Sequence, residues 1–116
     1  MRLAHADEIV QTFATSATAN EVLGKLRHVE GIGLTIATGL LWAYDPDRFV
    51  PFDKRTTGHC LLEKWIRKDA PVSADYEKTC ERVIAAAVGP GKRYDTIRDL
   101  VVGADDIPKE FYCSPR

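Results

Sequence analysis

The sequence predicts a compact all-α domain of about six helices. Apolar residues recur at helical spacing along most of the chain, and no segment alternates apolar and polar residues as a strand would. Proline, glycine and short polar runs separate these stretches at the usual length of helix-to-helix links. With 116 residues, of which 45% are hydrophobic, the chain suits one modest core, so we expect residues 1–116 to form a single domain.

The first half of the chain is expected to supply three helices. In the first, over about 6–17, the residues sharing one face are Ala6, Ile9, Val10, Phe13 and Ala17. Thr18 and Glu21 have the spacing of a capping box, so a second helix is expected to begin there. A third follows Gly33 and stops before Pro46. The residues expected on its buried face are Ile36, Ala37, Leu40, Leu41 and Tyr44.

The second half is expected to supply three more helices. Asp53 stands at an N-cap position before the fourth, in which Glu63 and Arg67 are spaced as an i, i+4 ion pair. The fourth helix is expected to bury Thr57, Leu61, Leu62, Trp65 and Ile66. The fifth begins near Pro71 and Ser73, and its apolar face consists of Tyr76, Cys80, Val83, Ile84 and Ala87.

The C-terminal part carries a short sixth helix after the "GPGKRY" turn. It presents Ile97, Leu100 and Val101 and stops at Gly103. Pro108 permits one more turn, and the tail at about 112–116 is expected to fray.

Composition excludes several classes of protein. A net charge of −1 is untypical of proteins that coat nucleic acid indiscriminately, which are strongly basic. No apolar run approaches the ~18 residues that span a membrane, and the N-terminus does not resemble a signal peptide. The cysteines at 60, 80 and 113 are too dispersed for a metal site or a disulfide framework. We therefore expect a cytoplasmic protein without a metal, a cofactor or a membrane partner.

The segment Gly31-Ile32-Gly33 contains two of the glycines found in nucleotide-binding loops. The residues around it exclude such a loop. A dinucleotide-binding fingerprint requires a third glycine at position 36, where the chain has Ile36, and it must follow a strand. The residues before Gly31 have helical periodicity instead. A tight turn between two helices, plugged by Ile32, is the simpler interpretation.

Such a turn is also suited to binding an anion. Glycines leave the first amides of the following helix open, and the helix dipole favours negative charge there. A DNA phosphate would bind the backbone of Gly31, Ile32, Gly33, Leu34 and Thr35 without reading base sequence. Lys25 and Arg27, just upstream, would add Coulomb attraction.

The segment "LRHVEGIGLTIATGLL" resembles the helix-hairpin-helix motif of DNA-binding and DNA-repair proteins, over about residues 19–44. The following "PDRFVPFD" is similar to the link that leads to the catalytic aspartate in the helix-hairpin-helix DNA glycosylase superfamily. Asp53 lies twenty positions after Gly33, a separation like that of the adenine-specific members. The resemblance covers roughly residues 22–66 and implies duplex DNA as the partner, with Asp53 as the catalytic carboxylate of a base-excision enzyme.

The sequence also departs from that superfamily. Thr35 stands where bifunctional members carry a nucleophilic lysine, so no Schiff-base chemistry is implied. Three dispersed cysteines cannot supply the four ligands of an iron–sulfur cluster. The chain is also short for the two subdomains that enclose a flipped base, unless a homodimer supplies both walls.

We therefore favour a non-enzymatic protein that binds DNA phosphates and derives from a glycosylase-like ancestor. Lys54, a cation in the first turn of a helix, is a candidate for an additional phosphate contact. Monofunctional base excision with Asp53 is one alternative, although N-capping is the more common role of such an aspartate. A protein-interaction or structural module, which the near-neutral charge favours, is the other.

Overall fold

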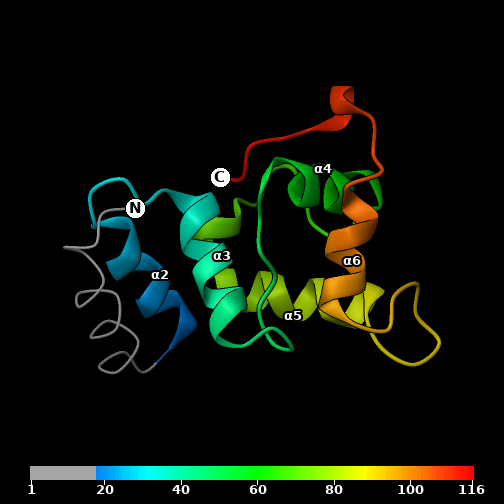
Figure 1. Cartoon of the computed structure of the whole chain (residues 1–116), viewed down its shortest axis with the longest axis horizontal. Coiled ribbons are helices and arrows are strands. Elements are labelled where there is room, and N and C mark those ends of the chain that lie inside the picture. Colours follow the sequence, from blue (N-terminus) through cyan, green and yellow to red (C-terminus); the bar gives the residue numbers. More distant parts are fainter. Residues whose placement is uncertain (1–17) are drawn as a thin grey trace.

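The computed structural model describes residues 18–116 and confirms the all-α prediction for this part of the chain (Figure 1). The first expected helix, at 6–17, lies outside the described residues. From residue 18 onward there are five α-helices and two 3₁₀ turns: α2 (Ala19–Arg27), α3 (Leu34–Tyr44), α4 (Lys54–Leu62), η2 (Val72–Ala74), α5 (Tyr76–Ala87), α6 (Ile97–Ala104) and η3 (Lys109–Phe111). Helix α2 packs against α3 and α5, whereas α4 packs against α6 and η3.

Side-chain caps explain where four of these helices begin. Thr18 accepts a hydrogen bond from the Glu21 amide at 3.1 Å, which confirms the predicted start of α2. Asp53 caps α4, as predicted, and Asp75 and Thr96 cap α5 and α6 in the same way. Helix α3 differs from these four, because its N-cap is a glycine and no side chain accepts from its first amides.

Helix α4 ends earlier than its sequence pattern predicts. Lys64 adopts a left-handed conformation with φ of 61°, and its amide donates to the Leu61 carbonyl at 3.1 Å. The next amide, of Trp65, donates to the Cys60 carbonyl at 2.9 Å. These two bonds form a Schellman motif, which satisfies the last carbonyls of the helix. Trp65 and Ile66 therefore lie beyond α4 rather than on its face.

The predicted ion pair between Glu63 and Arg67 does not form, because the helix that would align them has ended. Glu63 pairs instead with Arg93 at 2.6 Å. Arg67 pairs with Asp69 at 3.0 Å.

The buried face of α3 is rotated relative to the predicted one. Its buried residues are Leu34, Ala37, Thr38 and Leu41, at i, i+3, i+4 and i+7. Ile36 is 45% exposed and Tyr44 is 66% exposed, so the prediction for these two residues was wrong. The helix is apolar on most of its circumference, which leaves its sequence with little directional signal.

The link between α3 and α4 is anchored inside the core. After a turn at Asp45, it runs extended, and its buried residues are Phe49, Val50 and Phe52. The Tyr76 hydroxyl of α5 donates to the Val50 carbonyl at 2.7 Å. The Phe52 amide donates to Thr38 Oγ1 of α3 at 2.9 Å. Because both sides of the link are held, the start of α4 has a fixed position relative to α3.

Helix α4 approaches the C-terminal segment closely at Gly58. A Cβ atom on this buried glycine would overlap the carbonyl oxygen of Phe111 in η3 and would contact Ile107. The absence of a side chain at Gly58 therefore allows η3 to pack directly on the α4 backbone.

The tail that was expected to fray is held against the body of the molecule. It crosses from η3 back toward α3 along the upper edge of Figure 1. Three hydrogen bonds hold it: Cys113 N–H to the Lys54 carbonyl at 3.0 Å, Ser73 N–H to the Arg116 carbonyl at 2.9 Å, and the Arg116 guanidinium to the Lys68 carbonyl at 3.0 Å. The partners lie far away in the sequence, so the local sequence of the tail gave no sign of these bonds.

Candidate functional site

The turn between α2 and α3 has the tight geometry predicted for it. Gly31 has φ of 82°, a conformation that favours glycine, and the Ile32 amide donates to the Val29 carbonyl at 3.1 Å. The Ile32 side chain is only 5% exposed and plugs the corner. Gly33 has an ordinary extended backbone, and a Cβ atom there would meet no other atom within 4 Å. No residue from 18 to 116 therefore covers the outer side of the turn at Gly33.

The first amides of α3 lack partners within the helix. The first intrahelical bond runs from the Ala37 amide to the Gly33 carbonyl at 3.0 Å, so the amides of Leu34 and Thr35 precede it. The first turn contains no acidic residue, and Gly33 offers no side-chain acceptor. Partial positive charge thus accumulates at this end of α3.

The starts of α3 and α4 meet at one open depression of about 350 Å³. Its lining consists of Thr35, Asp53, Lys54, Arg55 and Tyr112. The structure thus brings together three of the predicted site residues, one from α3 and two from the start of α4. Thr38 is the reason for this meeting, because its hydroxyl donates to the Thr35 carbonyl at 3.3 Å and accepts from the Phe52 amide.

Asp53 serves as the N-cap of α4, as predicted. One carboxylate oxygen accepts from the Thr56 amide at 2.7 Å, and the residue is half-buried. The depression beside it is open, whereas a flipped base must be held between closed walls. A catalytic role for Asp53 stays a prediction.

Arg55 and Tyr112 also line the depression, and of these two only Tyr112 had no sequence signal. Arg55 Nε donates to the Tyr112 hydroxyl at 3.2 Å, and its guanidinium pairs with Asp105 at 3.1 Å. The hydrogen bond to Tyr112, followed by the one to Asp105, raises the pKa of Arg55 above its ordinary value. Arg55 shares with Lys54 the unusual position of a cation in a first helical turn, which was the available signal.

Lys25 and Arg27 lie in the last turn of α2, outside the lining of the depression. Lys25 forms an exposed ion pair with Glu21 at 3.1 Å, so part of its charge is compensated. Lys54, by contrast, has no acid within ion-pair distance among the described residues. Arg27 likewise has no acid within ion-pair distance among these residues, so Lys54 differs from it by lining the depression.

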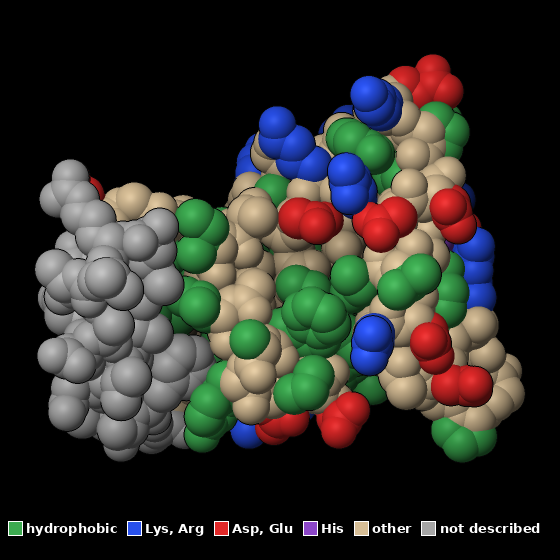
Figure 2. All heavy atoms as spheres, in the orientation of Figure 1, with side chains coloured by type: hydrophobic (Ala, Val, Ile, Leu, Met, Phe, Trp, Pro, Cys, Tyr) green, Lys and Arg blue, Asp and Glu red, His purple; other side chains and the backbone are tan. Residues whose placement is uncertain are grey.

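The charge on this side of the molecule is mixed. Lys and Arg side chains gather along the upper edge of Figure 2, where α4 and the tail lie in Figure 1, and acidic side chains lie directly below them. A ligand that contacts only the edge meets net positive charge, whereas a ligand that covers the whole face does not. The arrangement suits a local contact with one or a few anionic groups.

The buried cysteines are poor nucleophiles. Burial raises the pKa of Cys60 to about 12 and that of Cys80 to about 11, so both thiols stay protonated at neutral pH. In the part of the chain that the structure describes, no three His, Cys, Asp or Glu residues are placed to hold a metal ion.

None of the helices from residue 18 onward has the length and apolar character needed to cross a membrane. No family model matches the sequence, and neither a curated protein nor a solved structure matches it.

Proposed function

We propose that the protein binds duplex DNA through backbone phosphate, with the open N-terminus of α3 as the main contact. The supporting observation is that, among the five described α-helices, only α3 begins without a side-chain cap. A phosphate oxygen would supply the acceptors that Gly33 lacks. The resemblance of residues 22–66 to helix-hairpin-helix repair proteins supports DNA as the source of that phosphate and a repair enzyme as the ancestor.

The contact is expected to be small and sensitive to salt. Lys54 is the uncompensated cation at the depression, while Arg55 is paired with Asp105 and Asp53 contributes an opposing charge. Arg27 and Lys25 would extend the contact toward the end of α2. Two or three neutralised phosphates correspond to a slope of about −2 to −3 in a plot of log K against log salt concentration.

Fluorescence anisotropy with a labelled duplex, titrated over a range of salt concentrations, measures this slope directly. The key variant is Thr35→Asp, which places a carboxylate where the phosphate would bind. An acid in a first helical turn is compatible with folding, so the variant should remain stable while binding falls at least tenfold. Ala85→Asp, on the exposed face of α5, adds the same charge away from the depression and serves as the control.

Lys54→Gln should make the salt slope less steep by about one unit. Absence of binding at low salt and high protein concentration would refute DNA as the partner. Equal affinity in Thr35→Asp and Ala85→Asp would place the contact elsewhere.

Base excision is the second candidate function, favoured by the position of Asp53 in the same depression as Thr35. It predicts release of a damaged or mismatched base from duplex DNA. Asp53→Asn retains a good N-cap, so it should abolish release without unfolding the protein. Undiminished release in this variant would exclude Asp53 as the catalyst.

A further inference from the structure

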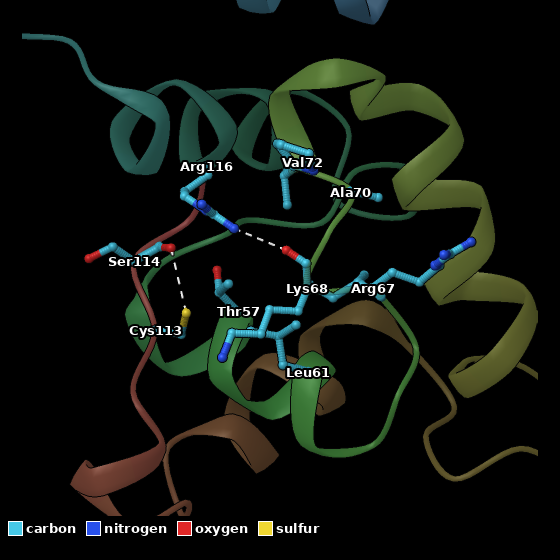
Figure 3. A pocket seen from close by; sticks show the side chains of 11 residues that line it. Thr57, Leu61, Arg67, Lys68, Ala70, Val72, Cys113, Ser114 and Arg116 are labelled. Atoms are coloured by element: carbon cyan, nitrogen blue, oxygen red, sulfur yellow. Dashed lines mark hydrogen bonds between the residues drawn. The ribbon is translucent and has the colours of Figure 1, made fainter.

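A second hollow, of about 370 Å³, lies between α4, the segment 66–72 and the tail (Figure 3). Much of its wall is apolar, with Leu61, Ile66 and Val72 contributing side chains. Its volume falls within the range of about 300–1,000 Å³ typical of small-molecule sites. None of its lining residues belongs to the depression at Thr35 and Asp53.

An unpaired hydroxyl lies in the wall of this hollow. Thr57 is only 3% exposed and its Oγ1 has no hydrogen-bond partner in the described structure, although the residue lines the hollow. In Figure 3 the Thr57 side chain lies in the space enclosed by the tail and the 66–72 segment, on the side of Arg116. Buried hydroxyl groups are normally hydrogen-bonded, so an acceptor placed in the hollow would satisfy the Thr57 hydroxyl.

Two cations at the hollow lack acidic partners. Arg67 is paired with Asp69, but the side chains of Lys68 and Arg116 have no acidic side chain within ion-pair distance among residues 18–116. The Arg116 guanidinium donates one bond to the Lys68 carbonyl and keeps further donors. An anionic group near Thr57 would therefore meet a hydroxyl donor and two positive charges.

We infer that this hollow binds a small organic carboxylate with an apolar body. The carboxylate would accept from the Thr57 hydroxyl and be compensated by Lys68 and Arg116, while the apolar body would pack on Leu61 and Val72. An adjoining hollow of about 680 Å³ shares Leu61 and Lys68, which provides room for larger members of this class. An inorganic anion would leave the apolar wall unfilled, and a neutral apolar molecule would leave the hydroxyl and both charges uncompensated.

The test is a titration of the full chain with 4-phenylbutyrate, in which binding is followed by two-dimensional NMR of the backbone amide groups. The comparison probes are 4-phenylbutyramide, which is the neutral analogue of this carboxylate, and inorganic phosphate. We expect 4-phenylbutyrate to shift the amide signals of Thr57, Leu61 and Ser114, and to bind at least tenfold more tightly than either comparison probe.

Two variants test the assigned groups. Thr57→Val removes the hydroxyl at nearly constant shape and should weaken binding at least fivefold. Thr56→Val is its matched control, because Thr56 is also buried with an unpaired hydroxyl on α4 but does not line the hollow. Lys68→Gln, on an exposed side chain, tests the charge independently of the core, with Lys78→Gln on α5 as its control.

Equal affinity for the carboxylate and its amide would overturn the inference. So would the absence of shifts at millimolar probe, or binding that neither Thr57→Val nor Lys68→Gln weakens. Should Thr57→Val fail to fold, Lys68→Gln alone decides, since its side chain is not part of the core.

Discussion

His59 is a buried titratable residue held by aromatic neighbours. Its side chain is only 3% exposed, and its Nε2 lies 3.0 Å from the Tyr94 hydroxyl. The ring meets Trp65 edge to face, with ring centroids 5.1 Å apart. Burial, and then the charge of Arg93, lowers the pKa of His59 below its ordinary value. The folded state therefore favours the neutral imidazole.

This lowered pKa predicts a loss of stability in acid. In the unfolded chain His59 titrates near pH ~6.5, above its folded pKa, so the folded state binds fewer protons between the two values. Its contribution is complete above pH ~6.5 and is lost as the pH falls through the folded pKa. Urea unfolding at pH 8 and pH 5 should show a stability difference between the wild type and His59→Gln that shrinks in acid. A difference independent of pH would contradict the assignment.

Substitutions of Asp53 test its contribution to stability as the N-cap of α4, independently of any function in binding or catalysis. Asp53→Ala removes the acceptor for the Thr56 amide and should cost about 1 kcal/mol of unfolding free energy. Asp53→Asn keeps an acceptor of similar quality and should cost much less. Urea unfolding at pH 7 measures both, and equal losses would show that the carboxylate does more than cap the helix.

At the scale of the element, the end of α4 stores conformational strain at a lysine. Lys64 occupies the left-handed position of a Schellman motif, where glycine is the usual residue. Lys64→Gly should therefore stabilise the protein, by up to roughly 1 kcal/mol. The same substitution at Lys78, inside α5, should destabilise it by about 1 kcal/mol. Thermal or urea unfolding of the two variants should give shifts of opposite sign.

Element boundaries were predictable wherever a local signal defines them. Thr18 and Asp53 have cap chemistry within three residues of their partners, and Pro46 excludes further helix, so these boundaries could be read from the sequence. The end of α4 could not, because neither Lys64 nor Glu63 is a helix breaker. The face of α3 could not either, since Ile36 is as apolar as the residues that α3 buries.

The residues of the candidate site were likewise predictable only where a local sequence signal exists. The open amides of Leu34 and Thr35 were predictable from the glycines, and Asp53 from its capping position. That Thr35 and Asp53 share one depression depends on Thr38, whose hydroxyl bonds to both neighbouring segments. The unpaired hydroxyl of Thr57 was not predictable, because a threonine is compatible with the apolar face of a helix and the sequence does not show whether the hydroxyl has a partner.

At the scale of the whole molecule, the tail joins segments that are distant in sequence. It bonds to the start of α4, to Lys68 and to Ser73. Deletion of residues 113–116 removes all three hydrogen bonds and should lower the unfolding free energy by about 2 kcal/mol. Arg116→Ala removes only the guanidinium bond and should cost less than half as much. Thermal unfolding of both variants measures this, and an unchanged melting temperature after deletion would show that the tail contributes no stability.

The close packing of η3 on Gly58 has a consequence for biosynthesis. A ribosome adds roughly 5–20 residues per second, so α4 is synthesised several seconds before the segment that contains Phe111. Until that segment is in place, η3 does not cover the backbone at Gly58. The α4 surface is therefore covered only after Phe111 has been synthesised. Messages truncated before Phe111 should yield chains that proteases remove quickly.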